Sequence, residues 1–358
     1  MDAYVALEGG HVVEARGRAP GTANGELVFT TAYTGYEESL TDPSYEEQIL
    51  TFAYPLIGNY GVRPERFESD RVHPRAAVTR EMTDDVAEWL TEEGVPAVDH
   101  IDTRDLVTDI REEGAMACGI AVGDDVTPED ALAELEDCVP MSDHTDIGAQ
   151  VSVDEPVVHD ADGDGATVAL VDCGAKRSIV DSLVARGAAV HVLPYDATAD
   201  DVVAIDPELL FISNGPGDPE NFDAAVELVD TFVGEVPIAG ICLGQQIVAE
   251  ALGGSTEKMD FGHRGVNQPV LDLESNQVVM TTQNHGYTVA EPGDHLEVTQ
   301  INVNDDTPEG IDGVEYDVIT RQYHPEANPG PEDTLDFFDD VLAMASGRAD
   351  SRAVPADD

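Results

Sequence analysis

The chain has 358 residues, enough for two domains with full hydrophobic cores, and its 42% hydrophobic content argues against disorder. Its 74 acidic and 17 basic residues give a formal net charge of -57, which is typical of a halophilic protein whose surface self-repulsion is screened by salt. The sequence has no basic patch, no signal-peptide pattern and no apolar run near the roughly 20 residues of a membrane span, so we expect no nucleic-acid partner, no membrane association and a cytoplasmic location.

Residues 1–145 are predicted to form a β-rich first domain that carries a few helices. Gly9-Gly10 between two apolar runs is typical of a hairpin turn. The polar, acidic and glycine-bearing stretch 146–165 is predicted to be a linker. Strands are expected at 4–7, 11–14, 25–36 and 48–55, and helices at 83–93, 102–111 and 127–137.

From residue 166 the strand and helix patterns alternate, which predicts a second, α/β domain over 166–346 with a largely parallel sheet flanked by helices. Ligands of such sheets bind at the carboxyl ends of the strands. An amphipathic helix at 331–345 is expected near the end of this domain, and residues 347–358 are predicted to be an acidic tail. The expected strands are 167–171, 189–193, 209–213 and 236–241, and a helix is expected at 176–186.

A candidate nucleophile, Cys242, lies where the fourth of these strands meets a helix. Gly240 and Gly244 flank it two residues to either side, which permits the sharp strand-turn-helix backbone of a nucleophile elbow. The start of a helix also favours a thiolate. Alternatively, Cys242 is a small buried core residue, which is the usual environment of a free cysteine. The paired glycines favour the nucleophile.

A candidate base follows much later in the chain, in His324-Pro325-Glu326. The proline keeps His324 extended, so the side chains of His324 and Glu326 point to the same side. A carboxylate on one ring nitrogen leaves the other nitrogen free to take a proton from a thiol. By itself this tripeptide would more often be a solvated turn, but together with the elbow it predicts a catalytic triad.

The glycine-bearing loop 213–219 directly follows a predicted strand. A rigid turn is the simple interpretation, but its glycine N–H groups are also suited to join the Leu243 N–H as donors to an oxyanion. Gln246 lies one helical turn after Cys242, so its side chain is expected to reach the same substrate.

Two other segments are expected to be loops at that edge of the sheet, 172–177 and 283–287. In the first, Lys176 is either a helix-start residue in an ion pair or a functional residue, and the sequence leaves both interpretations open. In the second, His285 is a lone loop histidine, which is more often structural, whereas His324 has a paired carboxylate.

The elbow 240–246 together with 324–326 resembles the class I glutamine amidotransferases, which hydrolyse glutamine through a Cys-His-Glu triad and pass ammonia to a partner active site. Four strings narrow the resemblance to carbamoyl-phosphate synthase small subunits: T-G-Y-x-E at 34–38, T-D-P-S-Y at 41–45, Y-P-x-I-G-N-x-G at 54–61 and D-x-G-x-K at 172–176. The resemblance runs from near the N-terminus to about residue 345.

This resemblance implies roles for individual residues. Cys242, His324 and Glu326 would form the triad. The L-glutamine site would include Ser44, Gly215, Gly217, Leu243, Gln246, Asn284, Gly286 and Tyr287.

The resemblance further implies a glutaminase subunit that forms a glutamyl thioester and delivers ammonia to a large subunit, which makes carbamoyl phosphate for arginine and pyrimidine synthesis. The resemblance implies that the partner uses ATP, bicarbonate and magnesium. This chain has no G-x-x-x-x-G-K-[ST] loop, so nothing in it suggests ATP binding, and no cofactor is expected on it. No metal is expected, since Cys118, Cys138, Cys173 and Cys242 are too sparse for a zinc site. An amidotransferase subunit of another synthase would keep the triad but not the first domain. A catalytically silent regulatory scaffold is the other alternative.

Overall fold

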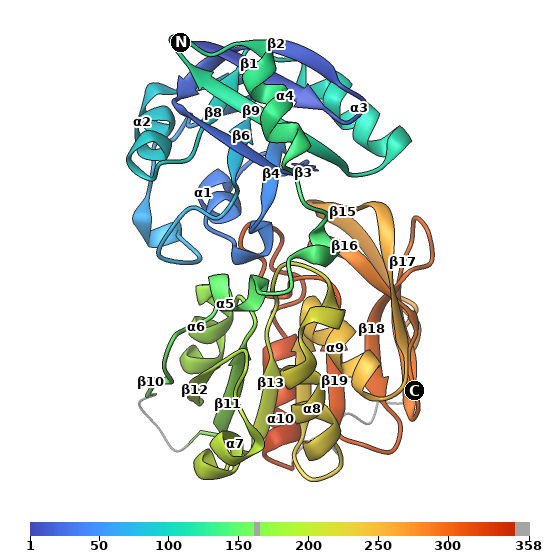
Figure 1. The fold of residues 1–358 in the computed structure, drawn as a ribbon. Coiled ribbons are helices and arrows are strands. Elements are labelled where there is room, and N and C mark those ends of the chain that lie inside the picture. The colour runs from blue at the N-terminus through green and yellow to red at the C-terminus, as the bar shows by residue number, and fades with distance from the viewer. Residues whose placement is uncertain (161–164, 348–358) are drawn as a thin grey trace.

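A computed structural model describes residues 1–160 and 165–347, so residues 348–358 of the predicted acidic tail lie outside the described part of the chain. Figure 1 shows two bodies, an N-terminal one built around a barrel and a C-terminal one built around an open sheet. Among the described residues, no helix is long and apolar enough to cross a bilayer.

The first body is a closed barrel with the strand order β1-β2-β8-β6-β4-β3-β9. Alternate side chains point inward, so Ala3, Val5 and Leu7 of one strand all enter the buried core. The predicted hairpin is confirmed, since β1 and β2 pair antiparallel. The barrel strands are β1 (Asp2–Leu7), β2 (His11–Ala19), β3 (Gly21–Thr30), β4 (Gln48–Phe52), β6 (Ala76–Val78), β8 (Ala97–Asp99) and β9 (Met116–Gly123), and β5 (Leu56–Ile57) pairs with β7 (Glu81–Met82).

The three helices predicted for this body are confirmed, but the strand predicted at 25–36 ends at Thr30. Gly35 has a φ of 77°, and an added Cβ would lie 2.2 Å from the Pro329 Cβ of the second body. The chain therefore turns at this contact and begins a short helix. The helices are α1 (Tyr36–Leu40), α2 (Asp84–Glu92), α3 (Thr103–Glu113) and α4 (Pro128–Glu136), with 3-10 turns at η1 (Pro43–Tyr45), η2 (Pro64–Arg66) and η3 (Met141–Asp143).

The second body contains a 10-stranded sheet with the order β10-β12-β11-β13-β14-β19-β18-β17-β15-β16. Its central five strands are parallel, and antiparallel strands extend both edges. The parallel strands are β11 (Thr167–Asp172), β12 (Ala189–Pro194), β13 (Leu209–Ile212), β14 (Ile238–Ile241) and β19 (Val318–Arg321). The others are β10 (Val157–His159), β15 (Ser255–Asp272), β16 (Val278–Glu291), β17 (Leu296–Asn302) and β18 (Pro308–Gly313).

Helices cover both faces of the parallel strands, as Figure 1 shows. Along β13, Leu210 and Ile212 enter one core, and Leu209 and Phe211 enter the other. The first core is closed by α7 (Ala199–Ile205), α8 (Asp223–Phe232) and α9 (Leu243–Ala251), and the second by α6 (Arg177–Ala185) and α10 (Phe337–Ala345).

Three segments differ from the sequence-based expectation. The stretch 146–165 contains α5 (Ile147–Val151) and β10, because Ile147 is fully buried and β10 pairs with β12. The C-terminal helix begins at Phe337, six residues later than predicted. The segment 283–287 is not a loop but the middle of β16, where buried polar side chains replace the usual apolar alternation.

Candidate active site

The backbone at Cys242 has the geometry expected of a nucleophile elbow. Cys242 ends β14 and caps α9 with φ 54° and ψ -105°, a conformation that non-glycine residues rarely adopt. An added Cβ on Gly240 would lie 2.7 Å from the Gly244 carbonyl carbon, and one on Gly244 would lie 2.2 Å from the Ile212 oxygen. Both glycines are therefore required, because strand, turn and helix pack with no room for a side chain.

The structure brings His324 and Glu326 to this elbow. His324 follows β19, and its backbone N–H donates to the Thr282 carbonyl at 2.8 Å. His324 Nδ1 lies 2.6 Å from Glu326 Oε1, and both side chains are buried. Burial lowers the pKa of His324, but Glu326 and the Cys242 side chain more than offset this and raise it to about 10. His324 Nε2 is buried and has no hydrogen-bond partner among the described residues, so the imidazole is a buried proton carrier whose second ring nitrogen is unoccupied.

Lys176 completes this buried charge network. Its ammonium lies 2.9 Å from Glu326 Oε1 and also donates to the Asn328 carbonyl. Burial raises the pKa of Glu326, but Lys176 and His324 outweigh it and lower the value to about 2. Burial lowers the pKa of Lys176, whereas Glu326, Glu68 and other carboxylates raise it above the usual range of lysine. Lys176 is thus an ion-pair residue that contacts the third member of the predicted triad.

Cys242 opens onto a small polar cavity of about 30 Å³ between the two bodies. Ser44 enters from the first body, where its hydroxyl accepts a hydrogen bond from Asn214 Nδ2 at 3.0 Å. Most of the predicted glutamine-site residues line this cavity: Ser44, Gly215, Gly217, Gln246, Asn284, Gly286 and Tyr287.

The backbone beside Cys242 offers donors for an oxyanion. Leu243 is the first residue of α9, so its N–H has no carbonyl partner within the helix. Gly215 packs against it, since an added Cβ there would lie 2.8 Å from Leu243 Cδ2 and 2.0 Å from the Cys173 oxygen. Gly217 has a φ of 90° and abuts Ile147 of the segment predicted as a linker.

Strand β16 carries the far wall of the cavity. The Cys242 Sγ lies 3.8 Å from the Asn284 carbonyl oxygen. Gln246 Nε2 donates to the Tyr287 carbonyl at 2.8 Å, which joins α9 to β16. His285 lies in the same strand, with Nδ1 2.8 Å from the Tyr287 carbonyl, and burial lowers its pKa, so it is neutral and hydrogen-bonded within its own strand.

The sequence analysis missed several residues of this site. Arg264 lines the cavity from β15, and Glu26 and Gln48 line it from the first body. All three lie in strands, and two have polar neighbours, Arg264 next to His263 and Gln48 after two glutamates. Their polar character therefore does not single them out in the sequence.

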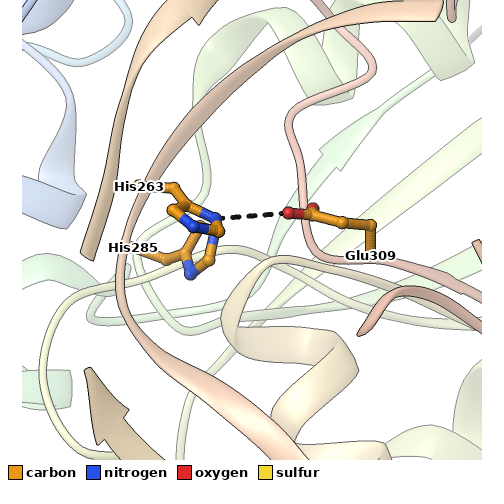
Figure 2. A group of neighbouring side chains, drawn as sticks. All are labelled: His263, His285 and Glu309. Carbon is orange, nitrogen blue, oxygen red and sulfur yellow. Dashed lines mark ion pairs between the residues drawn. The ribbon is translucent and has the colours of Figure 1, made fainter. Parts of the chain in front are cut away.

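Among the described residues, one group has the donor atoms that metals prefer: His263, His285 and Glu309 (Figure 2). The three side chains are buried, and their donor atoms lie within 4.8 Å of one another. His263 is already held between two carboxylates, with Nε2 2.8 Å from Asp305 Oδ2 and Nδ1 3.3 Å from Glu309 Oε1. Burial lowers the pKa of His263, but these carboxylates raise it overall. The ring of His263 is thus already bound by Asp305 and Glu309, and the cluster is a hydrogen-bonded histidine–carboxylate network.

The His324–Glu326 pair predicts a pH-dependent contribution to stability. Because the folded pKa of His324, about 10, exceeds the ordinary value of 6.5, the contribution is complete below pH 6.5 and is lost as the pH rises through 10. The difference in free energy of unfolding between the wild type and H324N should therefore shrink by a few kcal/mol over this range. Denaturant unfolding of both proteins in molar salt at several pH values measures this difference in free energy. H11N, at an exposed histidine, is the control, and a pH-independent difference for H324N would refute the prediction.

The family model "Glutamine amidotransferase class-I" matches residues 169–344, so the second body is a domain of the class I glutamine amidotransferases. A second model, "Carbamoyl-phosphate synthase small chain, CPSase domain", matches residues 5–120. The chain is 75% identical over 344 residues to the carbamoyl phosphate synthase small chain of Halobacterium salinarum, covering 96% of this chain and 97% of that one. The chain belongs to the family of carbamoyl phosphate synthase small chains.

A more distant relative has the same name and is matched over nearly its whole length. The carbamoyl phosphate synthase small chain of Methanocaldococcus jannaschii is 42% identical over 350 residues, which cover 96% of this chain and 99% of that one. Among solved structures, a glutamine amidotransferase from Thermotoga maritima covers 52% of this chain and 95% of its own, with 14% identity and a TM-score of 0.38. The family assignment rests on the sequence matches.

Proposed function

We propose that this chain is the glutaminase subunit of a glutamine-hydrolysing carbamoyl-phosphate synthase, with Cys242 as nucleophile, His324 as proton carrier and Glu326 as its partner. The observation that carries the proposal is the Cys242 elbow on the interdomain cavity, together with the buried His324–Glu326 pair, whose ring nitrogen Nε2 has no hydrogen-bond partner in the described chain. The N-terminal family match supports this synthase over one that makes anthranilate or GMP.

In the first half-reaction, the Cys242 thiol has given its proton to His324, the thiolate attacks the side-chain carboxamide carbon of L-glutamine, and the C=O electron pair moves onto oxygen. The N–H groups of Leu243 and Gly215 stabilise this oxyanion, where one donor contributes about 3 kcal/mol to the lowering of the barrier. When the C–N bond breaks, His324 gives its proton to nitrogen, and ammonia leaves. A glutamyl thioester remains on Cys242.

In the second half-reaction, water attacks the thioester carbon and gives a proton to His324. The C–S bond breaks, glutamate is released, and the Cys242–His324 pair returns to its starting state. Glu326 keeps the His324 ring oriented through Nδ1, and Lys176 keeps Glu326 ionised. The contacts within the buried network support these roles.

The remaining substrates belong to the partner in this proposal. Ammonia passes to a carbamoyl-phosphate synthase large subunit, which uses bicarbonate, ATP and magnesium, and this chain holds no cofactor of its own. The product feeds arginine and pyrimidine synthesis, so we place the complex in the cytoplasm. The substrate-contact roles of Ser44, Gly217, Gln246, Asn284, Gly286 and Tyr287 are part of the proposal, and their place on the cavity wall supports them.

Glutamate release from glutamine in molar salt, with and without the large subunit, tests the function. We expect slow hydrolysis by this chain alone and a roughly 5- to 150-fold acceleration when the partner, ATP and bicarbonate are added, the usual range of coupling between two sites. Hydrolysis that the partner leaves unchanged would indicate an amidotransferase of another synthase. Absence of hydrolysis in both conditions would indicate a silent scaffold.

A further inference from the structure

Three exposed arginines of the first body have no carboxylate partner. Arg80, Arg104 and Arg111 make no ion pair within the described part of a chain that holds 74 acidic residues. Every other described arginine except the buried Arg264 pairs with a carboxylate. An unpaired cation is therefore unusual on this acidic surface, and the three exposed ones lie together.

All three arginines line one open cavity of about 520 Å³, together with apolar side chains. We call this surface the arginine face, and its residues are Ala53, Pro55, Arg80, Arg104, Val107 and Arg111. Beside it in the chain, Tyr54 is 41% exposed and begins the string Y-P-x-I-G-N-x-G, to which the proposed reaction gives no role. Arginine and tyrosine next to apolar side chains are typical of the residues that contribute most to binding in protein interfaces.

Helix α3, labelled in Figure 1, keeps its arginines apart from its acidic residues. One side of the helix is buried, where Ile110 enters the barrel core. Arg104 and Arg111 are seven positions apart, which places them two turns apart on a second side. The exposed Asp109 and Glu112 fall on a third side. The acidic residues of the helix therefore leave the arginines available to a carboxylate from outside.

The arginine face is better suited to an acidic protein segment than to a phosphate group. Phosphates commonly bind free N–H groups at a helix start, but the Asp102 carboxylate already accepts from the Arg104 and Asp105 N–H groups, at 3.1 and 3.3 Å. Arg104 and Arg111 are about 10 Å apart along the helix axis, a spacing that separate carboxylates of one segment can match. Contact pairs in a cavity with an apolar wall also persist in molar salt, where charges separated by water are screened within about 3 Å.

We propose that the arginine face is the surface on which an acidic segment of the large subunit docks. The proposal rests on the function proposed above, which requires a partner protein. Strand β4 connects this face to the active site, because Gln48 at its start lines the glutamine cavity and Ala53, directly after its end, lines the arginine face. A partner docked there contacts an element of the cavity wall, which gives it a physical route to accelerate hydrolysis.

Binding of the purified large subunit to R104Q/R111Q, measured by calorimetry in molar salt, tests the arginine face. The dissociation constant should rise at least about 30-fold above that of the wild type, the usual effect of removing one partner of a buried interfacial charge pair. Because the occupant is acidic, R104E/R111E should bind more weakly still and R104K/R111K more tightly than R104Q/R111Q. Circular dichroism checks the fold, and R80Q, between β6 and β7, gives an independent loss of affinity if the helix variants do not fold.

D109N/E112Q is the matched control, because it removes two charges from another side of the same helix and should bind like the wild type. Without the partner, R104Q/R111Q should hydrolyse glutamine at the wild-type rate, and at a partner concentration that just saturates the wild type it should lose most of the acceleration. Equal binding by the wild type and R104Q/R111Q would overturn the proposal.

Two other occupants would overturn it as well. A second copy of this chain would appear in analytical ultracentrifugation as a wild-type dimer that R104Q/R111Q abolishes. A phosphate ligand would appear as binding of inorganic pyrophosphate to the wild type but not to R104Q/R111Q. A wild type that the large subunit neither binds nor accelerates would instead contradict the proposed function, and with it the occupant named here.

Discussion

Replacing Cys242 by serine is expected to abolish glutamine hydrolysis and leave the fold intact. The hydroxyl fits where the thiol lies, since Cys242 is 2% exposed and its side chain contacts the Asn284 carbonyl. A hydroxyl is a far weaker nucleophile than a thiolate, and loss of the nucleophile in a catalytic triad lowers kcat by about 10⁴-fold or more. Glutamate release in molar salt, with circular dichroism as the check of folding, measures the effect.

C138S is the matched control, because Cys138 is a free, half-buried cysteine at the end of α4, away from the cavity wall. Acid quenching of a reaction with labelled glutamine should trap label on the wild type and on C138S, but not on C242S. A C242S enzyme that retains activity, or that still traps label, would rule out Cys242 as the nucleophile.

The second large effect is expected for K176M, which removes the ammonium beside Glu326. Glu68 would then be buried without this cation and Glu326 would keep only His324, a loss that typically costs 3–5 kcal/mol and here corresponds to a fall in Tm of about 6–20 °C. The pKa of Glu326 should rise, and a neutral Glu326 would hold His324 through a weaker hydrogen bond that lacks the negative charge. Misoriented imidazole lowers kcat by roughly 10²- to 10⁴-fold in related triads.

R177Q is the control for K176M, because Arg177 is the next residue and its ion pair with Asp70 is largely exposed. Exposed pairs of this kind contribute about 0–1 kcal/mol, so R177Q should unfold close to the wild type. If the effect of K176M on kcat is electrostatic, raising the pH should ionise Glu326 and restore part of the lost kcat. A pH-independent loss of kcat would show instead that Lys176 acts only through packing.

The features that the sequence predicted correctly depend on short stretches of chain. The spacing of Gly240 and Gly244, each two residues from Cys242, predicts the elbow because the sharp turn can form only where these positions lack side chains. The hairpin at Gly9-Gly10 and the parallel strands were predicted from patterns within about ten residues. The triad roles, which the local patterns suggested, stay predictions until the variants are measured.

The errors arose where a segment's environment differs from what its own residues suggest. The polar run 283–287 suggested a loop, yet it lies within β16 because its side chains find partners inside the buried site. The acidic stretch 146–165 suggested a linker, yet Ile147 reaches the core of the second body. Polar composition predicts exposure only when no other part of the chain supplies hydrogen bonds.

By itself, the sequence determined the elbow, the His-Pro-Glu tripeptide and the order of strands and helices, because backbone preference and side-chain alternation are properties of neighbouring residues. Only the tertiary structure decided which charges meet. Lys176 and Glu326 are 150 positions apart and pair in a buried site, and Arg264 reaches the cavity shared with the first body. The pairing of buried charges follows from the packing of distant segments, where desolvation makes a partner necessary, and no local pattern carries that information.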